Sequence, residues 1–350
     1  MSLKARLEAE IAVSGPVDVA QFMTRCLHDP RDGYYATRPA IGEGGDFLTA
    51  PTVSQMFGEL IGLWLAEAWA GAGRPERALL VEAGPGDGTL LADILRAARL
   101  APDFHTACRL WLVETSPPLR RRQAERLADA APRWAASLAD LPDDGPIFLV
   151  ANELLDCLPA RQFLRTDRGW AERVVGLGPD GALAFGLTPT TACFPDAPIG
   201  AVMERSPAQE AFASELAARI VRQGGAALLI DYGAAKPGPG DTLQALQRHQ
   251  KVGPLASPGE ADLTVHADFP AVVSAARAAG AETALMTQGE FLARLGIEAR
   301  ASRLAEARPA RADAIARQLE RLTAPDQMGE LFKVAAIWRD APPPAFGDAR

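Results

Sequence analysis

A glycine-rich loop between an apolar run and a helical pattern constrains the fold of this 350-residue chain most strongly. Residues 78–82 read Ala-Leu-Leu-Val-Glu and predict a buried strand. Gly84, Gly86 and Gly88 follow, and a helical pattern begins at Thr89. Glycine lets a backbone turn tightly and lets a ligand approach where a Cβ would clash, and a helix that starts behind such a loop offers free N–H groups. The segment therefore predicts a strand–loop–helix unit with a ligand-binding turn.

Short apolar runs alternate with helical patterns through the rest of the chain, which predicts βαβ units and a parallel, doubly wound α/β sheet. The predicted strands are 78–82, 109–114, 134–138, 146–152, 226–232, 282–287 and 331–338, and the predicted helices are 89–100, 118–129, 208–223 and 269–279. Flanking regions break this rhythm. Residues 1–75 look mostly helical, 161–164, 170–176 and 183–187 predict an antiparallel insertion at about 160–200, and helices fill the insertion at about 289–325. We therefore expect a helical cap (1–75), one interrupted core domain (76–340) with an irregular stretch from about 240 to 263, and a loose tail (341–350).

The chain's charge and cysteine content exclude several classes of protein. Its 36 basic and 44 acidic residues give a formal net charge of −8, which argues against a nucleic-acid binder that works through bulk charge. The four cysteines contain no C-x-x-C pair, so neither a zinc site nor a disulfide framework is indicated. No apolar run approaches the roughly 20 residues that span a bilayer, and the mixed charges of residues 1–15 do not resemble a secretory signal. We expect a cytoplasmic protein without a membrane segment, and the oligomeric state stays open.

Two acidic residues extend the glycine signal. Glu82 precedes the first glycine, and Glu114 ends the next predicted strand, 26 residues after Gly88. The spacing G-x-G-x-G differs from the G-x-G-x-x-G of dinucleotide folds, which disfavours a NAD-dependent dehydrogenase, but a carboxylate at the position of Glu114 suits two ribose hydroxyls. The pattern predicts a nucleotide-type cofactor. The alternatives are a glycine turn without a ligand, and Glu114 as an acid near the start of the following helix.

A second group of polar residues leaves the strand at 146–152. Asn152 and Glu153 lie where open α/β sheets bind ligands, and Asp156 follows closely. Paired carboxylates such as Glu153 and Asp156 would hold a guanidinium bidentately and localise its charge. Alternatively, Asp156 caps a helix and Glu153 pairs with an arginine. Asp231 ends another strand at the same crevice, and His266 is either a base, a hydrogen-bonding clamp or a structural histidine.

The motifs taken together resemble the MidA family, a group of bacterial and mitochondrial proteins that includes an arginine methyltransferase assisting respiratory complex I assembly. The resemblance covers roughly residues 10–338. The matching segments are 33–35, 45–51, 54–59, the glycine loop, 114–117, Asn152-Glu153 with Asp156 and Pro159, 231–233, 241–243 and 328–333.

The resemblance implies a Rossmann-like class I methyltransferase core with a mostly parallel sheet, an antiparallel last strand, an N-terminal helical cap and a β insertion. It implies S-adenosyl-L-methionine as cofactor, and Gly45–Pro51 with Thr49 as a lid over it. Glu82, the three glycines, Glu114 and Asn152 would bind this cofactor, with Asp140 and Leu141 near its adenine. Glu153, Asp156 and His266 would act on the acceptor.

The leading hypothesis is therefore a protein arginine methyltransferase acting on a complex I subunit or its bacterial equivalent, with a mitochondrial matrix location for eukaryotic relatives. The alternative is a non-catalytic assembly factor that keeps the fold and docks on a protein partner.

Overall fold

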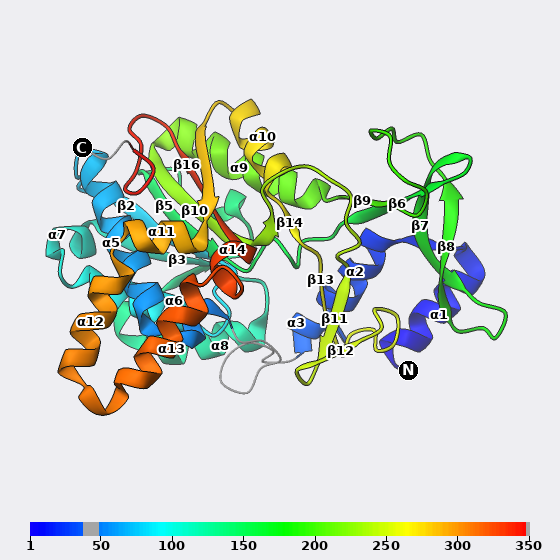
Figure 1. Cartoon of the computed structure of the whole chain (residues 1–350), viewed down its shortest axis with the longest axis horizontal. Coiled ribbons are helices and arrows are strands. Elements are labelled where there is room, and N and C mark those ends of the chain that lie inside the picture. The colour runs from blue at the N-terminus through cyan, green and yellow to red at the C-terminus, as the bar shows by residue number, and fades with distance from the viewer. Residues whose placement is uncertain (38–48, 348–350) are drawn as a thin grey trace.

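The structure is a computed structural model that describes residues 1–37 and 49–347 (Figure 1). Its central sheet has the strand order β15-β16-β10-β5-β2-β3-β4. All neighbouring strands from β10 to β4 run parallel, whereas β16 is antiparallel to both β10 and β15, which confirms the predicted fold class. The bounds are β2 Ala78–Ala83, β3 Cys108–Val113, β4 Arg133–Ala135, β5 Ile147–Asn152, β10 Gly225–Ala234, β15 Glu282–Thr287 and β16 Phe332–Trp338; the short β14 (Ala267–Asp268) pairs with the end of β10.

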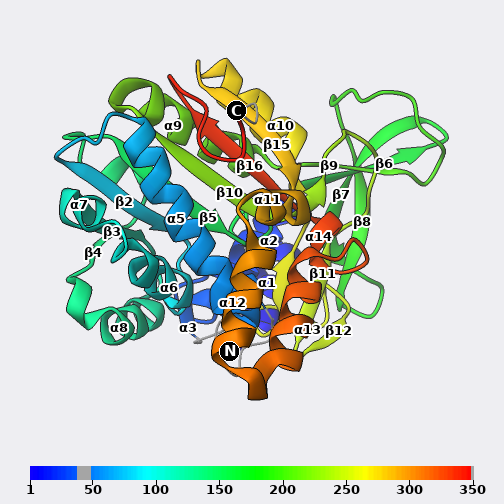
Figure 2. The ribbon, with the colours of Figure 1, turned by 60° about the vertical axis from the view of Figure 1, so that its left-hand side comes forward.

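Helices cover both faces of this sheet because its strands are apolar on both sides. Along β5, Phe148 and Val150 point into one core and Leu149 points into the other, as the period of two in a strand requires. The first core is closed by α5 (Gln55–Gly71), α6 (Thr89–Ala98), α7 (Pro102–Ala107), α11 (Gln288–Arg294), α12 (Ile297–Ala307), α13 (Ala312–Thr323) and α14 (Met328–Leu331). The second is closed by α9 (Pro207–Gln223) and α10 (Phe269–Ala278). Figure 2 shows α12 beside α5, with which it is in contact.

A second lobe lies at one side of the central sheet (Figure 1). It contains α1 (Leu3–Ser14), α2 (Val19–His28), a sheet of order β1-β7-β6-β9 in which β8 also pairs with β7, and a three-stranded sheet of order β12-β11-β13. The bounds are β1 Val17–Asp18, β6 Arg161–Thr166, β7 Gly169–Leu177, β8 Leu183–Pro189, β9 Val202–Arg205, β11 Gln244–Gln247, β12 Gln250–Val252 and β13 Asp262–Thr264. The expectation of an irregular stretch up to residue 263 was wrong, because β11 to β13 form there.

The residues expected to form one helical cap, 1–75, contribute to two different cores. Leu7 of α1 and Phe22 of α2 pack in the second lobe against Val175 and Leu263. Trp64 of α5 instead packs in the first core of the central sheet. The insertion at 160–200 therefore forms a lobe with the N-terminal helices rather than standing alone.

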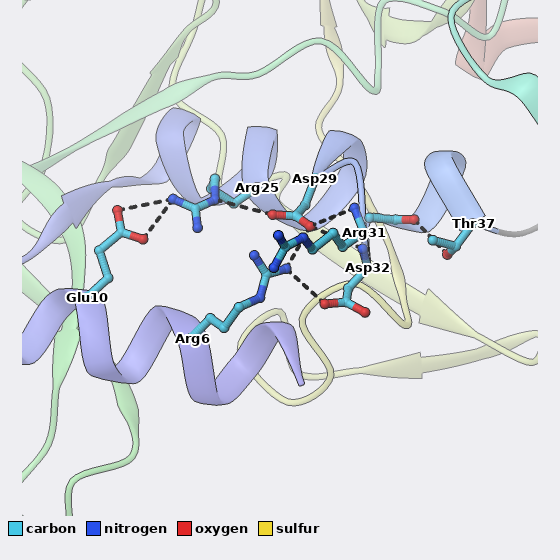
Figure 3. Close-up of polar contacts among 8 residues, drawn as sticks. Arg6, Glu10, Arg25, Asp29, Arg31, Asp32 and Thr37 are labelled. Atoms are coloured by element: carbon cyan, nitrogen blue, oxygen red, sulfur yellow. Dashed lines mark hydrogen bonds and ion pairs between the residues drawn. The ribbon is translucent and has the colours of Figure 1, made fainter. Parts of the chain in front are cut away.

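Ion pairs fix the turn that leads out of α2 toward α3 (Tyr34–Thr37) (Figure 3). The Arg6 guanidinium donates to Asp29 at 2.6 Å and to Asp32 at 2.8 Å, and this partner lowers the pKa of Asp29 to about 2. Arg25 donates to Glu10 of α1 at 2.8 Å. These contacts join α1 to the end of α2 and so determine where the following tyrosines lie.

The tail after Asp340, which the sequence led us to expect to be loose, is anchored as far as the structure describes it. The indole N–H of Trp64 donates to the carbonyl of Pro344 at 2.8 Å, and Arg294 donates to the carbonyl of Ala345 at 2.7 Å. Phe346 packs against the rings of Phe291 and Trp338. In the described part of the chain no helix is long and apolar enough to cross a membrane.

Candidate active site

The glycine loop adopts a backbone that side chains rarely permit. Gly84, Gly86 and Gly88 have φ values of +67°, +52° and +83°. Gly84 donates its N–H to the carbonyl of Val113 at 3.1 Å, and Gln123 of α8 (Pro117–Arg126) donates to the carbonyl of Gly86 at 2.7 Å. Helix α6 starts immediately afterwards. Its N-cap residue is Gly88, which has no side chain to cap the helix. The loop is thus held from outside, and Asp87 Oδ1 accepts the N–H of Thr89, the first residue of α6, at 3.0 Å.

Glu82 stands at the end of β2 with its carboxyl group buried. The residue is 2% exposed, and its Oε2 has no hydrogen-bond partner within residues 1–37 and 49–347. Burial, together with the nearby carboxylates of Asp87 and Glu114, raises its pKa to about 8. A buried carboxyl oxygen without a described partner, at the end of the strands where ligands bind, is a candidate to hold a cationic ligand group.

Glu114 follows β3 and turns its carboxylate back into the site. One oxygen accepts the N–H of Ser116 at 2.7 Å and the other accepts the side-chain amide of Gln123 at 3.2 Å. Burial raises its pKa. The hydroxyl of Ser116 caps α8 through the N–H of Leu119. Because Glu114 accepts the N–H of this N-cap residue, it is also an acid near the start of the helix, as the alternative had it.

Asn152 and Glu153 leave the carboxyl end of β5 in a strained turn. Glu153 has a φ of +53°, uncommon for a residue with a side chain, and donates its N–H to the carbonyl of Ile230 at 2.8 Å. Its Oε1 accepts the N–H of Ala50 at 3.2 Å and the amide of Asn152 at 3.1 Å. Burial and the neighbouring Asp156 raise its pKa to about 8. Among the described residues Glu153 forms no ion pair with an arginine, so none of these arginines neutralises its carboxylate.

Asp156 lies on the same loop and is 6% exposed. Its Oδ2 accepts the hydroxyl of Tyr232 at 2.7 Å, and its backbone N–H donates to Asp231 at 3.1 Å. Burial raises its pKa to about 6. Residues 153–160 contain turns and no helix, so Asp156 does not cap one. The loop of Asn152 to Asp156 therefore presents two buried carboxyl groups.

This acid loop touches the glycine loop. A Cβ placed on Gly84 would lie 2.9 Å from Leu154 Cδ1, so the side chain between Glu153 and Asp156 packs directly on the glycine backbone. The strand order explains the contact: β2 and β5 are neighbours, but the chain leaves them in opposite directions along the sheet, and ligands bind at such a switch point.

His266 is near this group without a direct contact to either acid. Its ring meets that of Tyr232 edge-on at 5.3 Å, and its backbone N–H donates to the hydroxyl of Thr242 at 2.8 Å. Burial and the charges of Lys251 and Lys333 lower its pKa. The residue lines two hollows of about 900 and 420 Å³, which have Thr242 and His266 in common. A larger cavity of about 1520 Å³ lies at the amino ends of β5 and β10, and none of the predicted site residues lines it.

The other predicted cofactor residues lie in less specific surroundings. Asp140 is exposed and its carboxylate accepts the N–H and hydroxyl of Ser137, forming a local cap. Leu141 is buried in the second core. Thr49 precedes α4 (Ala50–Val53), with its hydroxyl 3.4 Å from that of Thr52. Residues 45–48 of the predicted lid lie outside the described residues.

Comparison with known proteins agrees with this geometry. Residues 60–287 match the family model described as "Putative S-adenosyl-L-methionine-dependent methyltransferase". The chain belongs to this methyltransferase family. The Drosophila melanogaster protein named protein arginine methyltransferase NDUFAF7 homolog, mitochondrial, is 35% identical over 96% of this chain and 85% of its own length. Its Homo sapiens counterpart, NDUFAF7, is 33% identical over 94% and 81%.

A solved structure has the same fold as this chain. A crystal structure of a Burkholderia thailandensis protein bound to S-adenosyl-homocysteine superposes with a TM-score of 0.85 at 30% identity, covering 99% of this chain and 95% of that one. S-adenosyl-L-methionine is accordingly the cofactor of the family. Two observations on this chain fit such a molecule: buried oxygens of Glu82 and Asn152 have no partner in the described residues, and positive φ angles at Gly84, Gly86 and Gly88 shape the turn between β2 and α6.

Several residues of the methyltransferase site escaped the sequence predictions. Gln123 holds the glycine loop, Tyr232 binds Asp156, and Tyr35 donates its hydroxyl to both oxygens of Asp262 at 2.9 and 3.0 Å. Tyr35 and Tyr232 lie in the motif segments 33–35 and 231–233, but their hydrogen-bond partners are far away in the sequence. Nothing in the sequence singled out Gln123, which reads as one polar residue of a charged helix.

Proposed function

We propose that this methyltransferase transfers methyl groups to arginine side chains of a protein. The observation that carries the proposal is the pair of buried carboxyl groups, Glu153 and Asp156, on a loop that packs on the glycine loop. A guanidinium is a planar cation with five donors, and two carboxylates at one place match its fork. A neutral acceptor would not compensate two acids that pair with no cation among the described residues.

The chain's own residues suit each part of the cofactor. Glu82 and the side-chain oxygen of Asn152 would accept from its ammonium group, because Glu82 Oε2 and Asn152 Oδ1 are buried and the described residues offer them no donor. Glu114 would hold the ribose hydroxyls, and the glycines let the backbone approach. Asp140, Leu141 and Thr49 stay predicted contacts. The bound cofactor supplies an electrophilic methyl group on a sulfonium.

The acid loop, residues 152–156, would also accept the proton that methylation releases. When a guanidinium nitrogen gains a methyl group, one N–C bond forms, one S–C bond breaks and one N–H proton must leave. Glu153 has a pKa raised to about 8 in the free protein. The positive charges of the sulfonium and the guanidinium would lower this pKa and ionise the group, and its carboxylate can then take that proton and return it to water. Asp156 would orient the guanidinium, and His266, with a lowered pKa, would line the approach of the acceptor.

The acceptor is proposed from relatives named protein arginine methyltransferase NDUFAF7. We infer a protein substrate and, more narrowly, a subunit of respiratory complex I or its bacterial equivalent. The named relatives are mitochondrial, whereas a bacterial cytoplasmic location is proposed for this chain.

Glu153→Gln tests the chemistry because it keeps the shape of the side chain and removes its base. We expect S-adenosylhomocysteine to bind within about threefold of wild type by calorimetry, while methyl transfer to arginine falls about 100-fold or more. Glu76→Gln, at an exposed site, is the matched control. Unchanged transfer in Glu153→Gln contradicts the assignment of the base. If wild type binds cofactor, transfers no methyl, and Glu153→Gln still restores complex I assembly in cells lacking the protein, the non-catalytic assembly factor is the better explanation.

A further inference from the structure

The segment Asp231-Tyr232-Gly233 at the end of β10 has no role in binding the cofactor or the acceptor as described so far. Asp231 is fully buried, and its carboxylate accepts three backbone N–H groups. Oδ2 accepts those of Leu155 at 2.8 Å and Asp156 at 3.1 Å, and Oδ1 accepts that of Tyr232 at 2.8 Å. Asp231 therefore anchors the acid loop by its backbone and is not available to a ligand.

Tyr232 acts on the same loop through its side chain. The ring is 7% exposed and is held between two other rings, His266 at 5.3 Å and Phe332 at 5.5 Å, both edge-on. Its hydroxyl donates to Oδ2 of Asp156 at 2.7 Å. Because the ring cannot rotate freely, the position of this hydroxyl is set by packing, and it fixes one oxygen of the Asp156 carboxylate.

On the basis of the proposed function, we propose that Tyr232 is a positioning residue: its hydroxyl holds the Asp156 carboxylate in the one orientation that receives the acceptor guanidinium. Tyr232 itself touches neither acceptor nor cofactor. The aromatic clamp supplies rigidity, the hydroxyl supplies direction, and Asp231 holds the backbone on which Asp156 stands. The D-Y-G segment is thus part of the acceptor site although it contributes no group to the reaction.

The charges around Asp156 make the same hydroxyl important for ionisation. The titratable groups that face it are acids, thiols and phenols: Tyr35 from α3, Glu153 and Cys157 on its own loop, and Asp231 and Tyr232 from β10. None of these described groups is a cation. Burial raises the pKa of Asp156, and the Tyr232 hydroxyl is the largest of the contacts that lower it again. Loss of the hydroxyl should therefore raise this pKa further.

Tyr232→Phe removes the hydroxyl and keeps the ring between His266 and Phe332. We expect the S-adenosylhomocysteine dissociation constant to stay within about twofold, while kcat/KM for an arginine-containing acceptor peptide falls about 10- to 100-fold at pH 7, as for loss of a hydrogen bond to a charged group. The acid limb of the profile of kcat/KM against pH should move to higher pH. The loss of kcat/KM relative to wild type should therefore become smaller as the pH rises toward 9. A fall that is uniform across pH, or no fall, overturns the proposal.

Two further variants separate positioning from packing and from the proposed function. Phe332→Leu removes a ring contact but no hydrogen bond, so it should lower thermal stability without moving the acid limb. In an Asp156→Asn background, Tyr232→Phe should have no further effect on kcat/KM. If wild type methylates no arginine, the proposed function fails, and the carbon-13 resonance of the Asp156 carboxyl still decides the inference: its pKa must be higher in Tyr232→Phe than in wild type, and an equal pKa refutes it.

Discussion

Glu82→Gln should stabilise the protein without ligand while it weakens cofactor binding. The carboxyl group is 2% exposed, one of its oxygens has no partner among the described residues, and Asp87 and Glu114 add negative charge beside it. Ionising this group in the folded protein therefore costs free energy that the unfolded chain does not incur. Glutamine keeps the size of the side chain and never ionises.

The magnitude of the change in the free energy of unfolding follows from the pKa of Glu82, which is about 8 in the folded protein against the ordinary value of 4.5. Between these values the folded state holds a proton that the unfolded chain has lost, so the free energy of unfolding falls as the pH rises through this window. The full difference corresponds to about 5 kcal/mol, since one pKa unit is about 1.4 kcal/mol. Below pH 4.5 both states hold the proton and this contribution disappears.

Urea unfolding followed by tryptophan fluorescence at pH 5 to 9 measures the effect. We expect Glu82→Gln to be more stable than wild type by up to about 5 kcal/mol at pH 8.5, and the two to converge toward pH 5. Calorimetry should show about 10- to 100-fold weaker S-adenosylhomocysteine binding, because the ligand's ammonium loses a charged acceptor. Glu76→Gln is the exposed control. A stability difference that is the same at every pH would refute the reasoning, because it would show that Glu82 is not desolvated.

Two further predictions concern the fold. Gly225→Ala should lower the free energy of unfolding by more than about 3 kcal/mol in urea titrations, because φ is +107° and a Cβ would lie 2.0 Å from the carbonyl oxygen of Ile147; Gly181→Ala, with φ of +79° and open space, should cost about 1 kcal/mol. The second concerns Asp29, whose pKa of about 2 beside Arg6 lies below the ordinary 3.8: it stabilises above pH 3.8, and this contribution is lost as the pH falls through 2. Acid unfolding of Asp29→Asn should lack that component, and identical acid titrations of variant and wild type would contradict it.

The central sheet was predictable because its strands are buried on both faces and read as continuous apolar runs. Residues 147–152 are an example: every one of them is buried, as in parallel sheets generally. The sheet of β11 to β13 was not predictable in this way. Its strands have three or four residues, and polar residues make up two of four in Gln244–Gln247 and two of three in Gln250–Val252. Their pairing with one another and the packing of β13 on α2 create these strands, and neither leaves a periodic pattern in so short a segment.

The functional site was likewise predictable only in part from the sequence. Glu82, Glu114, Asn152 and Glu153 follow strands whose ends meet at one edge, so strand prediction alone brings them together. The contacts that orient them depend on packing between distant segments. Tyr232 and Asp156 are 76 residues apart, and the amide of Gln123 reaches a glycine 37 residues away. A single sequence carries no local signal for such pairs.

The acidic surplus of the chain has a specific place in the structure. Glu82, Glu114, Glu153, Asp156 and Asp231 are carboxyl groups gathered at the carboxyl end of the sheet, and burial raises the pKa of each. The proposed reaction begins with two cations, a sulfonium and a guanidinium, and ends with one cation, a neutral thioether and a proton. Acids that hold protons in the empty site can ionise when the cations enter, and Glu153 can regain one when the sulfonium charge is lost. The desolvation that destabilises these carboxylates in the free protein thus favours binding of the charged reactants and release of the less charged products.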